Sequence, residues 1–165
     1  MFRKMRRFKQ QLTDNESIEI LEKGKTGVLA VMGDEGYPYT VPINYVYENG
    51  KIYIHCAKNG HKIDAIKNCD KVSFCVIDKD DVVKYELTTY FSSVVVFGKA
   101  RILEDEQEIF RSAQVLGLKY NSDKQRVDKE IIQEMKALCC VEITIEHMTG
   151  KQAKELMQNN KNNQN

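Results

Sequence analysis

The segment that most constrains the fold is residues 36–68, GYPYTVPINYVYENGKIYIHCAKNGHKIDAIKN. Residues 37–47 alternate between two faces, as a β-strand does. One face carries Val41, Ile43, Tyr45 and Tyr47, and the other carries Thr40, Pro42, Asn44 and Val46. Asn49-Gly50 is a strong hairpin turn signal, so a returning strand is expected at 51–56. The segment predicts a β-hairpin, followed by a short helix from about His61 to Asn68.

Cations gather where this short helix begins. Lys58, His61 and Lys62 surround Asn59-Gly60, although the positive end of the helix dipole disfavours positive side chains. Asn59 is a plausible N-cap, and glycine at position 60 allows a close approach to a ligand. A bound anion such as a phosphate would share the helix N-terminus with the cations. A solvated basic turn is the alternative, and the spacing leaves both interpretations open.

The chain has only two prolines, Pro38 and Pro42, and both fall in one predicted strand. Proline cannot donate to a sheet ladder, so a central, fully paired strand is excluded there. The strand is either an edge or bulged strand, or one whose free side faces a ligand. Asn44 shares the face of Pro42 and could hydrogen-bond to a heteroaromatic ring.

His55 ends the returning strand, six residues before His61. A lone strand histidine is usually structural, but the cationic cluster nearby makes His55 a candidate functional residue. His147 has no such neighbours and is expected to be structural. Ser92 and Ser93 precede an apolar strand and could contact the same phosphate.

The rest of the chain is rich in strands. A helix is expected from Thr13, which forms a capping box with Glu16, and further helices from Asp105 and near 127–137. Strands are expected at 27–32, 71–77, 88–103 with a bend at Gly98, and 139–146, with a final helical turn at 150–157. Alternating βαβ order is absent, so an antiparallel β-barrel with helices packed outside fits best.

The 165 residues suggest one domain at 1–157, with a basic arm at 1–10 and a polar tail at 158–165. The formal net charge of +1 does not favour nucleic acid as a partner. No secretory signal follows the basic start, so a cytoplasmic location is expected. The spacing of the five cysteines fits no zinc pattern, and no metal site is predicted.

No GxSxG, HExxH or phosphate-loop motif occurs. If the chain is an enzyme, a cofactor is expected to supply its chemistry. A non-catalytic binder and a nucleic-acid or membrane-surface module driven by the basic arm are the alternatives.

PYTVPINYVY, IYIHCAKNGHKIDAIKN, VSFCV and YFSSVVVFGKARIL together resemble the nitroimidazole-resistance (Nim) group. This group belongs to the pyridoxamine 5′-phosphate oxidase-like FMN-binding split barrels. The resemblance covers roughly residues 5–150. It implies a mainly β, antiparallel, Greek-key-like split barrel that forms a homodimer with FMN between the subunits.

The resemblance also implies the cofactor-binding residues. Residues 40–45 would line the flavin ring, His55, Cys56 and Ala57 would border the ring and ribityl chain, and Lys58, His61 and Lys62 would lie at the phosphate. His61 stands where the family has an arginine, and Ser93 stands where it has a glutamine. The full set is Thr40, Val41, Pro42, Ile43, Asn44, Tyr45, His55, Cys56, Ala57, Lys58, His61, Lys62, Ser92 and Ser93.

The expected function is that of an FMN-dependent oxidoreductase, nitroreductase-like, which reduces small planar acceptors such as nitroimidazoles. His55 would be its proton donor or substrate contact. The pyridoxal phosphate signature of the family's oxidases is not recognisable at the C-terminus, so vitamin B6 oxidation is not expected. The alternative is a non-catalytic flavin or haem binding or sensing protein on the same barrel.

Overall fold

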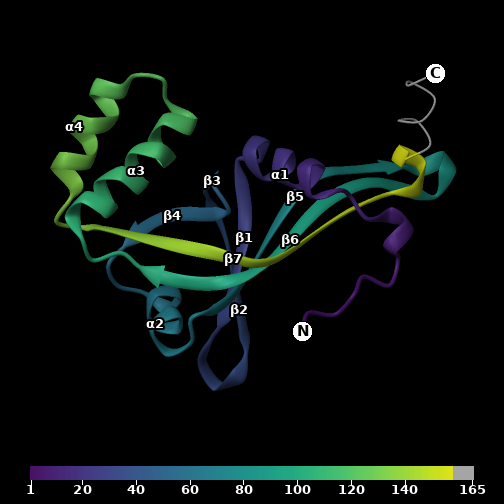
Figure 1. Ribbon diagram of the computed structural model, residues 1–165, viewed down its shortest axis with the longest axis horizontal. Coiled ribbons are helices and arrows are strands. Elements are labelled where there is room, and N and C mark those ends of the chain that lie inside the picture. The colour runs from purple at the N-terminus through teal and green to yellow at the C-terminus, as the bar shows by residue number, and fades with distance from the viewer. Residues whose placement is uncertain (158–165) are drawn as a thin grey trace.

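The computed structural model describes residues 1–157; the expected tail at 158–165 lies outside the described residues. Seven strands form one antiparallel sheet in the order β2-β1-β5-β6-β7-β4-β3, which confirms the mainly β prediction (Figure 1). The strands are β1 (Thr26–Met32), β2 (Pro38–Asn44), β3 (Val46–Glu48), β4 (Lys51–Ala57), β5 (Lys71–Val83), β6 (Thr88–Ile102) and β7 (Leu138–Gln152). The helices are α1 (Asp14–Lys23), α2 (His61–Asn68), α3 (Glu106–Tyr120) and α4 (Lys124–Glu134), with single 3-10 turns at Phe8–Gln10, Asp34–Gly36 and Lys84–Glu86.

The two edge strands of the sheet, β2 and β3, are consecutive in the chain and only Tyr45 separates them. The edges therefore meet at this residue, and the sheet curls into a barrel that is closed there. Away from Tyr45, β2 and β4 make no strand pairing with each other in the described residues. The barrel is thus split between β2 and β4.

The single strand predicted at 37–47 is wrong at Tyr45. The Tyr45 N–H donates to the Tyr120 hydroxyl at 3.3 Å, and that hydroxyl lies 2.9 Å from the Tyr45 carbonyl oxygen. The Tyr45 backbone therefore bonds to a side chain of α3 instead of a neighbouring strand. This interruption turns one edge strand into two and lets the chain cross from one sheet edge to the other.

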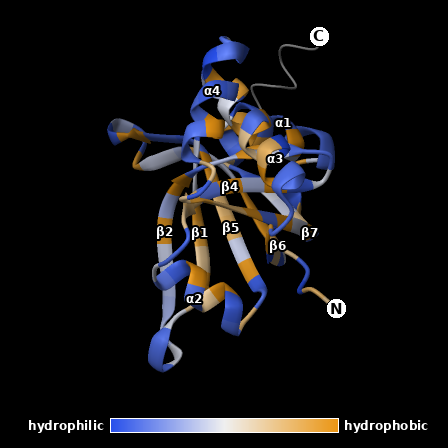
Figure 2. Cartoon of the chain, turned by 90° about the vertical axis from the view of Figure 1, so that its left-hand side faces the viewer, coloured by the Kyte–Doolittle hydropathy of each residue, from blue (hydrophilic) through white to orange (hydrophobic). Residues whose placement is uncertain are grey.

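Helices α1 and α2 close the two ends of the barrel (Figure 1). The predicted capping box is present at α1, where Thr13 and Glu16 bond reciprocally. Leu21 of α1 and Ile63 and Ile66 of α2 are buried in the core, as their spacing predicts. Figure 2 shows the hydrophobic side of α2 turned towards the strands.

Helices α3 and α4 form a hairpin that covers the outer face of β4 and β7 (Figure 1). Its buried side chains include Ile109 and Ala113 of α3 and Val127 and Ile131 of α4. The helix expected at 127–137 begins earlier, at Lys124, because Asp123 caps it by accepting from the Arg126 N–H at 3.0 Å.

Strands β5, β6 and β7 run further than the barrel requires. The strand predicted at 71–77 continues to Val83, because each of the added residues but Asp78 pairs with β6. The strand predicted at 139–146 continues to Gln152, so the helical turn expected at 150–157 is reduced to 154–157. The predicted bend at Gly98 is confirmed by a register shift between Phe97 and Gly98.

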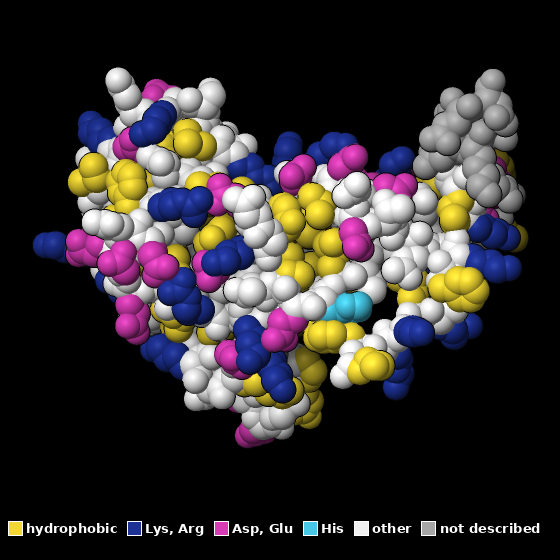
Figure 3. All heavy atoms as spheres, in the orientation of Figure 1, with side chains coloured by type: hydrophobic (Ala, Val, Ile, Leu, Met, Phe, Trp, Pro, Cys, Tyr) yellow, Lys and Arg dark blue, Asp and Glu magenta, His cyan; other side chains and the backbone are white. Residues whose placement is uncertain are grey.

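The basic arm lies along the sheet. Gln11 bridges Lys151 of β7, and the Phe2 ring stacks on His147 at a centroid distance of 4.6 Å. Figure 3 shows acidic and basic side chains interspersed over the lobe of α3 and α4, with no large area of one sign on that face. No helix among residues 1–157 is long and apolar enough to cross a bilayer.

Candidate functional site

The free edge of β2 faces the split. The Gly33 N–H donates to the Tyr37 carbonyl at 2.9 Å, and hydrogen-bonded and non-bonded pairs alternate along an antiparallel ladder. Pro38, Thr40, Pro42 and Asn44 therefore direct their backbone groups away from β1. The two prolines lose no ladder bond: β2 is an edge strand, and its free edge lines the split. That a ligand occupies the free side stays a prediction.

The edge of β4 faces the same split. The Ile145 N–H donates to the Gly50 carbonyl at 3.2 Å, so by the same alternation His55 and Ala57 direct their backbone groups away from β7. Strand β3 pairs with β4 only as far as Tyr53. Two strand edges with unpaired backbone groups therefore border the split, and a ligand lying between them could take up these hydrogen bonds.

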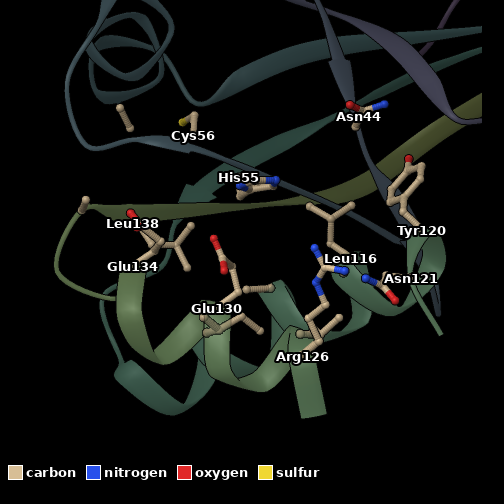
Figure 4. Close-up of a pocket in the computed structure, with 16 residues that line it drawn as sticks. Asn44, His55, Cys56, Leu116, Tyr120, Asn121, Arg126, Glu130, Glu134 and Leu138 are labelled. Atoms are coloured by element: carbon tan, nitrogen blue, oxygen red, sulfur yellow. The ribbon is translucent and has the colours of Figure 1, made fainter. Parts of the chain in front are cut away.

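A pocket of about 700 Å³ lies between this part of the barrel and the α3–α4 hairpin (Figure 4). Its volume is within the usual range of small-molecule sites. Four predicted residues line it: Asn44, His55, Cys56 and Ala57. The hairpin contributes Ala113, Leu116, Gly117, Tyr120, Asn121, Arg126, Val127, Glu130, Ile131 and Glu134, and Ala137 and Leu138 complete the wall.

His55 supplies the imidazole side chain that lines this pocket. Its side chain is on the outer face of β4, towards the hairpin, and is exposed to the pocket (Figure 4). Desolvation by the surrounding protein lowers the pKa of His55 below its ordinary value of 6.5. The imidazole is therefore neutral at pH 7, with one nitrogen able to donate and the other able to accept.

The N-terminus of α2 has no side-chain cap. The N-cap is Gly60, with φ of 134°, and the expectation that Asn59 caps this helix is wrong. Positive φ is easy only for glycine, which lets the chain turn into the helix at this point. Lys58 is exposed and Lys62 half-buried beside this terminus. Uncapped N–H groups together with two lysines suit an anion.

Lys62 also lies near Cys56. Burial raises the pKa of the Cys56 thiol to about 11, and the positive charge of Lys62 opposes this rise. Cys56 is therefore a neutral thiol at pH 7 and contributes packing rather than a nucleophile.

His61 points away from the pocket. Its ring stacks on Tyr39 at a centroid distance of 4.2 Å, and its Nε2 lies 3.6 Å from the Asp34 carboxylate. The imidazole thus contacts the turn before β2, while the backbone of the same residue forms the first turn of α2.

The remaining predicted residues divide by face. Thr40 and Pro42 are exposed on the outer face of β2, and Val41 and Ile43 pack partly against the core. Tyr45 is fully buried, and its hydroxyl donates to the Leu21 carbonyl at 2.8 Å. The Tyr45 side chain has no surface left for a ligand, which contradicts the expectation that this side chain lines a flavin ring.

The two serines predicted to contact the phosphate, Ser92 and Ser93, lie on β6, away from the pocket beside His55. Ser92 is buried, 4% exposed, and donates to the Asp78 carboxylate, in a smaller cavity lined also by Leu12 and Gln152. Ser93 is half-buried on the outer face of β6. Neither serine lines the pocket beside His55 within one copy of the chain.

The sequence analysis missed the contribution of the helical hairpin to the pocket. Tyr120, Asn121, Arg126 and Glu130 all line it. Arg126 and Glu130 each precede a buried residue of the α4 stripe, Val127 and Ile131. Charged residues beside an apolar stripe occur on most surface helices, so the sequence carries no signal specific to a cavity here.

Comparison with known proteins agrees with this architecture. The family model of pyridoxamine 5′-phosphate oxidase matches residues 13–152. No curated protein sequence matches the chain. Among solved structures, a candidate 5-nitroimidazole antibiotic resistance protein from Bacteroides thetaiotaomicron is 21% identical with a TM-score of 0.71, over 86% of this chain and 85% of that one.

Two further solved structures bind cofactors. An FAD and haem binding protein from Mycobacterium smegmatis is 17% identical with a TM-score of 0.72, over 88% of this chain and 74% of that one. An FAD-binding protein from Mesorhizobium loti is 24% identical with a TM-score of 0.62, over 87% and 97%. At these identities the likeness shows the fold. With the family model matching most of its length, this chain belongs to the pyridoxamine 5′-phosphate oxidase family.

Proposed function

We propose that this chain is a flavin-dependent oxidoreductase that holds FMN in the split between β2 and β4. The observation that carries the proposal is the pair of open strand edges ending at an uncapped, lysine-flanked helix terminus. The backbone groups at Thr40, Asn44 and His55 would bond the ring, and the α2 terminus with Lys58 and Lys62 would take the phosphate.

The site favours a single phosphate group. One helix N-terminus with two lysine side chains beside it adjoins the split, and His61 is engaged with Tyr39 and Asp34. A mononucleotide presents one terminal phosphate to such a site, whereas FAD would need a further partner for its second phosphate and adenosine. We therefore propose FMN, although solved structures of this fold include FAD-binding proteins.

The proposal includes a homodimer. The outer face of the sheet carries an apolar row in which Val28, Cys75 and Val95 are cross-strand partners. Ile77, Phe97 and Met32 on the same side are 61%, 41% and 52% exposed. A second copy packed on this face would bury them. It would also place Ser93 in the interface between the two copies, since Ser93 shares this face with Val95.

The pocket beside His55 would receive the electron acceptor. A bound flavin supplies hydride or electron transfer. The chain would hold a small planar acceptor, such as a nitroimidazole, between the flavin ring and the apolar wall of the hairpin. The His55 imidazole would donate a hydrogen bond to the acceptor in its neutral form, or a proton from its minor protonated form.

Purified protein tests the proposal directly. The protein should carry a yellow flavin, or take up FMN with a shifted visible spectrum and quenched flavin fluorescence, and it should bind FMN more tightly than FAD. Reduced protein should then be reoxidised by a 5-nitroimidazole under anaerobic conditions. Absence of binding at saturating FMN would refute the assignment.

A non-catalytic flavin or haem protein is the second candidate. The pocket offers one imidazole and a largely apolar wall, and a solved protein with this fold binds both FAD and haem. Steady turnover of a nitro compound by a reduced nicotinamide would exclude this candidate. A Soret band that appears on adding haemin and is lost in His55→Ala would favour it.

A further inference from the structure

Two opposite charges on helix α4 point into the pocket. Arg126 and Glu130 both line it, and Figure 4 shows their side chains directed from α4 towards β4. They are four residues apart, the spacing at which helix side chains can form an ion pair. Within residues 1–157, neither of them has a partner at salt-bridge distance.

The neighbouring pair on the same helix behaves differently. Lys124 and Asp128 have the same spacing and do form an ion pair, and Asp128 also accepts from Gln114 of α3. The hydrogen bond from Gln114 to Asp128 joins the two helices of the hairpin. The side chains of Arg126 and Glu130 are therefore free to serve a ligand, whereas Lys124 and Asp128 serve the fold.

An apolar surface lies between these charges and the strand. Leu116 and the buried Val127 and Ile131 form this wall, and His55 faces it from β4 (Figure 4). Apolar walls with a few placed polar groups are typical of small-molecule sites. A ligand that carried only one charge would contact only one of these two side chains.

We propose that this pocket binds a small amphoteric molecule with an apolar, planar body. Its anionic or acceptor group, a carboxylate or nitro group, lies at Arg126, and its cationic or N–H donor group lies at Glu130. The body packs on Leu116 and Val127, with one edge near His55. The inference deepens the proposed function, on which it rests for the position of the flavin, because it names the class of acceptor that the flavin would meet.

Three matched probes separate the two ends of such a ligand. They are 4-(aminomethyl)benzoate, which carries both charges, benzoate, which carries only the anion, and benzylamine, which carries only the cation. The chain has three histidines, so the imidazole proton signals of His55 can be assigned by substitution in an NMR spectrum. We expect the doubly charged probe to bind most tightly and to shift the His55 signals, with those of His147 unchanged.

Three variants on one helix test the roles of the charges. Arg126→Gln should weaken 4-(aminomethyl)benzoate and benzoate about tenfold, the lower end for losing a hydrogen bond to a charged group. Glu130→Gln should weaken 4-(aminomethyl)benzoate and benzylamine and spare benzoate. Lys129→Gln, an exposed residue that does not line the pocket, is the matched control and should change none of them. All three positions are exposed, and thermal unfolding should confirm an unchanged fold.

The proposal is overturned if no probe shifts His55, if the three probes bind equally, or if Arg126→Gln and Lys129→Gln have the same effect. The same titrations on flavin-free and flavin-loaded protein separate this result from the proposed function. Protein that binds FMN but not the probes refutes the pocket assignment alone. Protein that binds the probes but no flavin refutes the proposed function and keeps the pocket.

Discussion

The barrel is closed at Tyr45, directly after the last residue of β2, and split along the free edge of β2 itself. At the closed end, Tyr45 is fully buried, its backbone bonds to Tyr120, and its hydroxyl bonds to the Leu21 carbonyl. The Lys119 ammonium lies over the Tyr45 ring at 4.2 Å from the centroid. At the split end, backbone groups of β2 and β4 face each other without a strand between them.

The difference teaches where stability and binding are located in this fold. A buried polar group without a partner is costly, so the closed end fixes its backbone with bonds from distant residues. The split end keeps unpaired groups where water or a ligand can reach them. Substitutions at the closed end should therefore change the free energy of unfolding, and those at the split end should change binding or turnover.

The largest effect is expected at the closed end. Tyr45→Ala should destabilise the protein by about 3–5 kcal/mol, the usual cost of removing a large buried aromatic side chain. Denaturant unfolding followed by circular dichroism measures it. Tyr37→Ala is the control, because Tyr37 is 74% exposed, and it should cost about 0.5 kcal/mol or less. Equal losses in the two variants would contradict this account of the closed end.

Turnover should depend on the imidazole in the pocket. His55→Ala should leave FMN bound and slow nitro-compound reduction by about 100-fold or more, as for loss of a general acid or base. Stopped-flow reoxidation of the reduced protein measures the step. Lys129→Gln, at an exposed residue that does not line the pocket, is the control and should be unaffected. A His55 variant with full activity would remove this residue from the mechanism.

Flavin affinity should depend on the lysine at the start of α2. Lys62→Ala should weaken FMN by about 1.5–3 kcal/mol, because it removes a charged hydrogen-bond donor from the phosphate. Its effect on the unfolding free energy should be small. Lys67→Ala, in the last turn of the same helix, is the matched control. If both variants bind FMN like the wild type, the phosphate lies elsewhere.

The smallest expected effect is a dependence of the free energy of unfolding on pH. The pKa of His55 is lower in the folded protein than its ordinary value of 6.5 because of desolvation. Below pH 6.5 the unfolded chain therefore binds more protons at this residue than the folded chain does. The free energy of unfolding should fall as the pH drops below 6.5. The fall should be slight, since the side chain is exposed to the pocket. Unfolding curves of wild type and His55→Gln from pH 7 to 5 should diverge in that window, and parallel curves would count against the lowered pKa.

Local signals in the sequence were sufficient for much of the fold. The Thr13–Glu16 capping box, the Asn49-Gly50 turn and the bounds of α2 are all set by neighbouring residues, and the structure has them as predicted. The break between β2 and β3 at Tyr45 could not be predicted from neighbouring residues. Its cause is the Tyr120 hydroxyl, 75 residues away, while the alternating pattern continues through the break.

The candidate site was predicted only in part for the same reason. Asn44, His55, Cys56 and Ala57 lie on two adjacent segments of the chain, and the structure places them around one pocket. The far wall of the pocket comes from α3 and α4, which long-range bonds such as Lys119 to the Gly24 carbonyl hold in place. Residues such as Arg126 reach the pocket because the α3–α4 hairpin docks on the barrel. No local sequence pattern specifies that docking.

The two prolines of β2 have a consequence for the free edge of the sheet. An unpaired strand edge is a template on which another molecule can add a strand, the usual start of aggregation. Pro38 and Pro42 both direct their ring nitrogens to that edge and offer no N–H there. They deny an incoming strand two of its hydrogen bonds, which disfavours strand addition at the open split.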